Sequence, residues 1–170
     1  MYKCIIKIKG RTDNLLLYVD GSYNHKKKIY SYGVVIVDND TVIHTISGCG
    51  NDEMGLSMRN VTGEVLASIH AVKYAMDNNY KSITICYDYS GIEHWALKTW
   101  KRNNKLTQYY CSFMQEAMKE INIKFVKIKS HSGNYYNEMV DKLAKEAGDI
   151  KWIYHILYKI YYGINNRINK

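Results

Sequence analysis

LLLYVDGSYN, residues 15–24, is the stretch that decides the fold, because an apolar run is followed there directly by an aspartate. A short run of apolar and aromatic residues is typical of a buried strand. Asp20 and Gly21 after such a run are a common hairpin signal, which predicts a second strand immediately afterwards. Apolar residues return only near Ile29, so a plain loop or turn is the simplest interpretation of this stretch alone. The rest of the sequence has to decide whether Asp20 has another role.

Length, charge and cysteine content limit the classes of protein to consider. The chain has 170 residues, enough for one domain with its own core, and a formal net charge of +8. This excess of positive charge is typical of proteins that attract polyanions such as nucleic acids or anionic membranes, without identifying either. The four cysteines are widely scattered and form no CxxC pair, which argues against zinc or thioredoxin-like chemistry.

Apolar segments give no sign of a membrane protein. The sequence contains no run of about 18 apolar residues, the length that predicts a membrane-spanning helix. Its first residues, MYKCIIKIKGR, include no apolar stretch as long as that of a secretory signal. We therefore expect a cytoplasmic protein without stable membrane insertion.

The spacing of apolar residues predicts five strands and four helices. The strands are expected over residues 15–19, 32–37, 41–46, 82–87 and 121–129. A first helix is expected over residues 63–79, after a glycine-rich connection over residues 48–60. Helical spacing also covers residues 92–121, with a break near Asn104, after which Thr107 is the expected cap of a further helix.

A last amphipathic helix completes the pattern. Its apolar face is formed by Met139, Val140, Leu143, Ala144 and Ala147. The order of elements, β-β-β-α-β-α-α-β-α, is typical of an α/β protein with a mixed sheet and helices on both faces. No internal repeat or linker is evident.

Two end segments lie outside this pattern. Residues 1–14 alternate weakly and are expected to form an arm or an extra edge strand. Residues 149–170 form an amphipathic tail with an apolar stripe at helical spacing, surrounded by lysines. Such a stripe packs on its own domain, mediates self-association or contacts a membrane surface. We expect a monomer, with association through the tail as the alternative.

Four acidic residues lie where a ligand site can form. Asp20 and Asp88 each follow an apolar strand, and both carboxylates emerge at one edge of the sheet if these strands are parallel neighbours. Open α/β sheets bind ligands at that edge. Glu64 is expected to open the first long helix, and Asp141 lies within the last one.

Each acid also has a simpler explanation by itself. The helix dipole explains an acid such as Glu64 at a helix N-terminus. A solvated surface explains Asp141, which shares a polar helix face with Asn134, Asn137, Glu138 and Lys145.

Gathered in one site, the four carboxylates would raise one another's pKa and would need protons or cations to neutralise them. Mg²⁺ prefers oxygen ligands, and two such ions about 4 Å apart activate a water and stabilise the leaving oxygen of a phosphodiester. A basic protein with an acidic pocket therefore suggests a nuclease.

Four motifs connect these acids to a known family. They are YVDGSYN at 18–24, NVTGE at 60–64, CYDYSGI at 86–92 and KSHSGNYYNEMVDKLAKEA at 129–147. In this order they make residues 15–148 resemble the type 1 ribonucleases H, which cut the RNA strand of RNA–DNA hybrids. The resemblance implies a ribonuclease H-like mixed five-stranded sheet flanked by helices on both faces. It also implies a metal-dependent endoribonuclease that leaves 3′-hydroxyl and 5′-phosphate ends.

The resemblance assigns catalytic roles to the four acids and to one histidine. It implies two Mg²⁺ ions, with Mn²⁺ as a substitute: one shared by Asp20 and Asp141, the other held by Asp20, Glu64 and Asp88. His131 matches a histidine on a mobile loop that assists proton transfer or product release. The alternative for His131 is a loop histidine without a function.

The resemblance also implies a surface that binds the hybrid. Asn60 matches a residue on the minor-groove side, and Gly21 and Ser22 let the backbone approach the RNA strand, whose 2′-hydroxyl groups distinguish it from DNA. The residues expected to grip the DNA strand lie on one predicted helix within residues 91–105. They are Trp95, Lys98, Trp100, Lys101 and Arg102. The alternative is that both tryptophans pack in the core.

One departure from the family lies at residues 101–105, where this chain has only KRNNK and many members carry a separate basic helix. The tail over residues 151–170 has no counterpart in the family. The expected division is an arm or edge strand (1–14), a catalytic domain (15–148) and a tail (149–170).

Three other functions fit the sequence: a related nuclease such as a junction resolvase or a reverse-transcriptase module, a hybrid-binding module without activity, and a membrane- or partner-docking protein built around residues 151–170.

Overall fold

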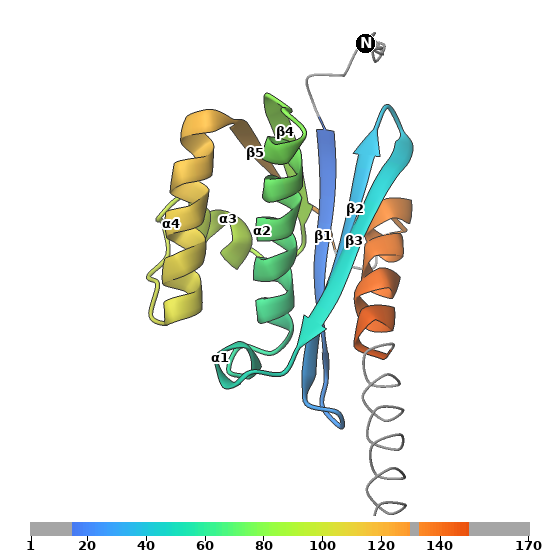
Figure 1. Ribbon diagram of the computed structural model, residues 1–170, viewed down its shortest axis with the longest axis vertical. Helices are drawn as coiled ribbons and strands as arrows, with labels where there is room; N and C mark the ends of the chain where they lie inside the picture. The colour runs from blue at the N-terminus through green and yellow to red at the C-terminus, as the bar shows by residue number, and fades with distance from the viewer. Residues whose placement is uncertain (1–14, 130–132, 150–170) are drawn as a thin grey trace, which may run out of the picture.

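The computed structural model describes residues 15–129 and 133–149, which form a sheet with helices on both faces (Figure 1). The strands are β1 (Leu15–Asn24), β2 (Ile29–Asp38), β3 (Thr41–Gly50), β4 (Ser82–Tyr87) and β5 (Asn122–Lys127). The helices are α1 (Glu53–Leu56), α2 (Asn60–Asp77), α3 (Gly91–Ala96) and α4 (Lys105–Glu120), and a further helix covers residues 135–149.

The five strands form one mixed sheet in the order β3-β2-β1-β4-β5. β2 pairs antiparallel with both β1 and β3, whereas β4 pairs parallel with both β1 and β5. This arrangement confirms the predicted α/β fold. The condition for Asp20 and Asp88 to meet at one edge of the sheet is fulfilled, because β1 and β4 are parallel neighbours.

β1 is longer than predicted. Its parallel pairing with β4 ends at Tyr18, but its antiparallel pairing with β2 continues to the pair Asn24–Ile29. The predictions that the strand ends at Asp20 and that Asp20 and Gly21 form a turn are therefore wrong, and the turn lies at residues 25–28. At Asp20, β1 is therefore still paired with β2, but it is no longer paired with β4.

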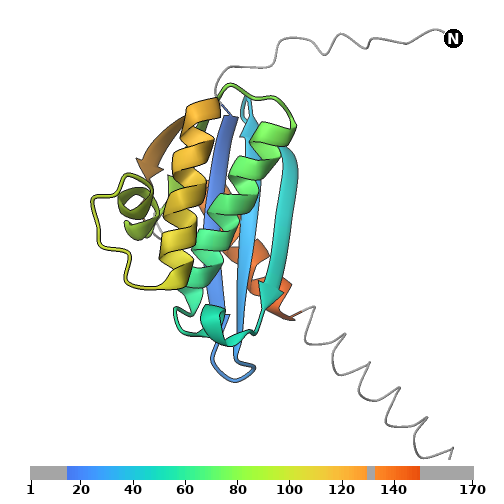
Figure 2. The same ribbon diagram turned by 60° about the vertical axis from the view of Figure 1, so that its left-hand side comes forward.

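Helices cover the two faces of the sheet separately (Figure 2). α2 and α4 pack on one face over a core that includes Leu17, Val65 and Met114, all of which are fully buried. The helix over residues 135–149 covers the other face, where Val140 packs in a smaller cluster with Val35 and other apolar residues. Both faces are thus shielded, as the predicted pattern of apolar residues requires.

Two local predictions differ from the structure. Asn104, not Thr107, caps α4, since its side-chain oxygen accepts a hydrogen bond of 2.9 Å from the backbone N–H of Thr107. The short helix α1 was not predicted, and it begins after Asp52, whose side chain accepts from the N–H of Gly55. Among the described helices none has the length and apolar character needed to cross a bilayer.

Candidate active site

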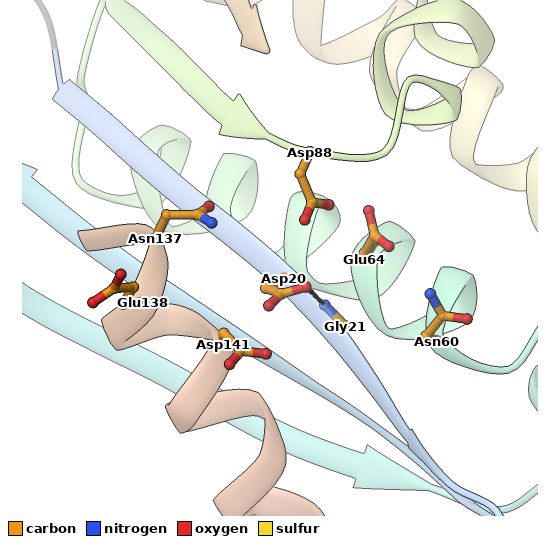
Figure 3. A pocket seen from close by; sticks show the side chains of 8 residues that line it. All are labelled: Asp20, Gly21, Asn60, Glu64, Asp88, Asn137, Glu138 and Asp141. Atoms are coloured by element: carbon orange, nitrogen blue, oxygen red, sulfur yellow. Dashed lines mark hydrogen bonds between the residues drawn. The ribbon is translucent and has the colours of Figure 1, made fainter. Parts of the chain in front are cut away.

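An acidic pocket lies where β4 ends beside β1 (Figure 3). Its volume is about 190 Å³. It is lined by Asp20, Gly21, Asn60, Glu64, Asp88, Asn137, Glu138 and Asp141. The structure therefore brings all four predicted acids to one place, from β1, α2, the end of β4 and the helix over residues 135–149.

Three of the acids are close enough to share a cation. Asp20, Glu64 and Asp88 each offer a carboxylate oxygen, and these oxygens lie within 4.8 Å of one another. The parallel pair Tyr18–Cys86 is the last between β1 and β4, and each aspartate follows its member of this pair by two residues along the chain. The parallel register thus explains why Asp20 and Asp88 meet.

Glycine at two positions allows α2 to approach β1 and bring Glu64 beside Asp20. A Cβ atom at Gly21 would overlap the carbonyl oxygen of Asn60 and the backbone nitrogen of Glu64. A Cβ atom at Gly63 would likewise overlap the carbonyl oxygen of Ser31. Gly21 therefore has a structural requirement, in addition to its predicted role at the RNA strand.

The prediction that Glu64 opens its helix is wrong. α2 begins at Asn60, its first turn contains no acidic residue, and its N-cap residue Arg59 has a positive φ of 55° and makes no side-chain capping bond. Since the dipole effect decreases beyond the first turn, it does not explain Glu64. The acid lies one turn further in, where it is only 3% exposed.

Burial dominates the electrostatics of Glu64. Desolvation, followed by the charges of Asp88 and Asp20, raises the pKa of Glu64 to about 9, although a hydrogen bond from the backbone of Tyr89 opposes this change. Its Oε2 atom is buried and has no hydrogen-bond partner among the residues that the structure describes. A buried carboxylate oxygen without a partner is costly unless a proton or a cation satisfies it.

Asp20 is affected in the same direction. Burial and the charge of Asp88, with a smaller contribution from Asp141, raise its pKa to about 7. The backbone N–H of Gly21 donates a hydrogen bond of 2.7 Å to Asp20 Oδ1 and opposes this rise, as does the charge of Lys145.

The donors of this pocket fit a hard divalent cation. Carboxylate oxygens from three separate parts of the chain lie within 4.8 Å of one another. The Oε2 atom of Glu64, one of these three acids, is buried and has no hydrogen-bond partner among the described residues. Mg²⁺ and Mn²⁺ prefer such oxygen ligands, whereas histidine or cysteine would indicate zinc. Within residues 15–129 and 133–149, no cysteine or histidine lines the pocket.

Asp141 lines the same pocket but does not belong to the group of three. Its Oδ2 lies 2.6 Å from Nζ of Lys145, one helical turn away. The helix that carries it is capped by Asn134, whose side chain accepts from the backbone N–H of Asn137.

Asn137 is buried, at 8% exposure, although it was assigned to the solvated face, and it lines the pocket together with Glu138. The four-residue spacing to Asp141 is the signal that could have placed Asn137 on the pocket side.

The predicted hybrid-binding residues separate into different surroundings. Asn60 lines the pocket, whereas Ser22 is not among the lining residues. Trp95 is a core residue, at 7% exposure, which agrees with the alternative of core packing. Trp100 is 41% exposed and stacks on His94, with ring centroids 4.7 Å apart.

One structural prediction for this region is wrong, because α3 ends at Ala96. Trp100 and Lys101 therefore lie in the loop before α4 and do not share a helix with Trp95. His131, residues 1–14 and the tail from residue 150 lie outside the described residues, so their predicted roles stay predictions.

Comparisons with known proteins point to one family. A family model described as RNase H matches residues 12–149. Ribonuclease H of Clostridium botulinum strain Hall is 27% identical over 152 residues, covering 79% of this chain and 95% of that protein. Ribonuclease H of Treponema denticola is 25% identical over 158 residues, covering 79% and 96%.

Solved structures with the same fold include a ribonuclease H1 from the archaeon Halobacterium salinarum, with a TM-score of 0.66 and 20% identity over 80% of this chain and 98% of that one. LC11 ribonuclease H1, which was isolated from compost and solved in complex with an RNA/DNA hybrid, has a TM-score of 0.66 and 20% identity, covering 81% and 99%.

Proposed function

This chain belongs to the ribonuclease H family, and we propose that it hydrolyses the RNA strand of RNA–DNA hybrids with two divalent ions, leaving 3′-hydroxyl and 5′-phosphate ends. The observation that carries the proposal is the convergence of Asp20, Glu64 and Asp88 in a pocket that Asp141 also lines. The net charge of +8 supports a polyanionic substrate, since an acidic pocket alone would repel phosphates.

Each acid has a distinct role in this proposal. Asp20, Glu64 and Asp88 would hold one Mg²⁺, and Asp20 and Asp141 would hold the other, with Mn²⁺ as a substitute. When bound, such ions supply an activated water and stabilise the leaving 3′ oxygen. Asp20 lies between the other acids in the pocket and is therefore the residue that both ions would share (Figure 3). His131 is proposed to assist proton transfer or product release.

The substrate-binding residues divide between the two strands of the hybrid. Asn60 and Gly21 line the pocket, and with Ser22 they are proposed to contact the RNA strand and the minor-groove side. Trp100 and Lys101 are exposed on the loop after α3 and are proposed to bind the DNA strand through ring and phosphate contacts. Trp95 is buried and is proposed to support this loop by packing against Trp100, since the centroids of the two rings lie 6.2 Å apart.

The remaining expectations concern the whole chain. We propose a monomer with a catalytic domain over residues 15–148, preceded by an arm or edge strand and followed by an amphipathic tail. A cytoplasmic location also remains a prediction. Association through residues 149–170 would appear as a dimer that is lost when the tail is removed.

The experiment that tests the function is cleavage of a hybrid with its RNA strand labelled at the 5′ end. The full chain is expected to produce shortened RNA fragments with 3′-hydroxyl ends in the presence of Mg²⁺. Excess EDTA should abolish cleavage, and added Mn²⁺ should restore it.

Duplex DNA and duplex RNA of the same sequence are the controls in this assay. Equal cleavage of either control would favour the related nucleases considered above. Hybrid binding without cleavage in either metal would favour a binding module.

A further inference from the structure

Asp141 is in the pocket, yet a lysine of its own helix holds its carboxylate. Lys145 Nζ lies 2.6 Å from Asp141 Oδ2, with side-chain exposures of 59% for the lysine and 32% for the aspartate. Asp20, Glu64 and Asp88 form a group of candidate ligands, and Asp141 is not part of it. The ammonium group of Lys145 therefore contacts the carboxylate of Asp141. In the proposed function, the same carboxylate would bind a divalent ion.

The influence of Lys145 extends past its immediate partner. Its charge acts on the Asp20 carboxyl, where it opposes the repulsion from Asp88 and Asp141. Lys145 thus lies close enough to two of the proposed ligands to compensate part of the negative charge of the pocket. A divalent cation would provide the same compensation, with two charges instead of one.

We propose that Lys145 is a positioning residue that acts as a tethered counter-cation: it holds Asp141 when no metal is bound and competes with Mg²⁺ for the Asp20–Asp141 side of the pocket. This inference rests on the proposed function. Lys145 lowers the affinity for Mg²⁺, so its removal strengthens binding.

The same helix offers a matched control. Lys142 pairs with Glu146 at 3.8 Å in the same four-residue spacing, and neither residue lines the pocket. Replacing Lys142 by glutamine changes the net charge and the helix surface as Lys145→Gln does. It leaves Asp141 and its partner unchanged.

The test is isothermal titration of Mg²⁺ into metal-free full-length protein at pH 8. Lys145→Gln is expected to lower the dissociation constant about threefold to tenfold, a moderate change because the ion pair is partly exposed and screened. Lys142→Gln should stay within about twofold of the wild type, and Lys145→Arg, which keeps the charge, should do the same. Raising the salt concentration should shrink the difference between Lys145→Gln and the wild type.

The outcomes separate this inference from the function on which it rests. If the wild type binds Mg²⁺ and Lys145→Gln binds it equally or more weakly, the inference is wrong and the proposed function is unaffected. An equal gain in Lys142→Gln would also overturn it, because net charge would then explain the effect. If the wild type binds no Mg²⁺, both proposals fail.

Discussion

Replacement of Asp88 by asparagine is expected to reduce hybrid cleavage in Mg²⁺ by at least about a hundredfold, while hybrid binding changes by less than about threefold. Asparagine keeps the size of the side chain but removes one of three carboxylates whose oxygens lie within 4.8 Å of one another. The loss should appear in kcat, because the proposed contacts to the hybrid come from other residues. Cleavage rates and binding affinity, measured on the same labelled hybrid, check both parts.

Asp77→Asn is the matched control for this substitution. Asp77 is exposed at the last position of α2 and is not among the residues that line the pocket. It should leave both cleavage and binding unchanged. If Asp88→Asn cuts at the normal rate, the acidic pocket is not the catalytic site.

The second large effect concerns stability in the absence of metal. Metal-free protein is expected to lose about 1–2 kcal/mol of unfolding free energy between pH 7 and pH 9. The reason is that the pKa of Glu64 is raised to about 9 by burial and by the neighbouring aspartates. The folded state therefore retains a proton that the unfolded chain has already released, and stability decreases as the pH rises toward the folded pKa.

This pH window separates the effect of Glu64 from those of Asp20 and His70, whose pKa values are also shifted. The pKa of Asp20 is raised to about 7, so most of its contribution is lost below this window. The pKa of His70 is lowered by burial and by Lys73, which places its effect below pH 7. Urea unfolding in EDTA at several pH values gives the slope.

Glu64→Gln should flatten the slope and stabilise the metal-free protein at pH 9, because it removes the buried carboxylate that must ionise. The same variant should lose cleavage, a typical exchange of stability against activity. Saturating Mg²⁺ should likewise reduce the slope in the wild type, since metal binding stabilises the ionised form. A wild-type slope that persists in Glu64→Gln would show that another group is responsible.

The sequence predicted the fold largely because its elements have clear periods. Five strands and the main helices follow from apolar spacing, whereas the sequence left the parallel pairing of β1 with β4 as a condition that the structure fulfils. The end of β1 could not be predicted in this way. The pairs Ser22–Ser31 and Tyr23–Tyr30 extend the strand beyond Asp20, and they depend on contacts with β2 that no local signal in Gly-Ser-Tyr-Asn reveals.

The sequence predicts which residues form the candidate site better than it predicts their burial and their positions within the helices. The strand-end position of Asp88 is a local signal, whereas the depth of Glu64 depends on a helix start at Asn60 that lacks a side-chain cap. The tryptophans show the same limit. A continuous helical pattern predicts Trp95 and Trp100 on one helix, but α3 ends at Ala96, between them. Trp95 is therefore buried in the core, and Trp100 is exposed on the following loop. The spacing of Asp141 and Lys145 was visible, but not which side of the helix faces the pocket.

The most direct test of the central claim is anomalous diffraction from crystals of the protein grown with Mn²⁺. We expect two anomalous peaks in the acidic pocket: one among Asp20, Glu64 and Asp88, and a second between Asp20 and Asp141. Absence of any peak at these carboxylates in crystals saturated with Mn²⁺, or peaks only elsewhere on the protein, would contradict the proposal that these acids bind paired metal ions.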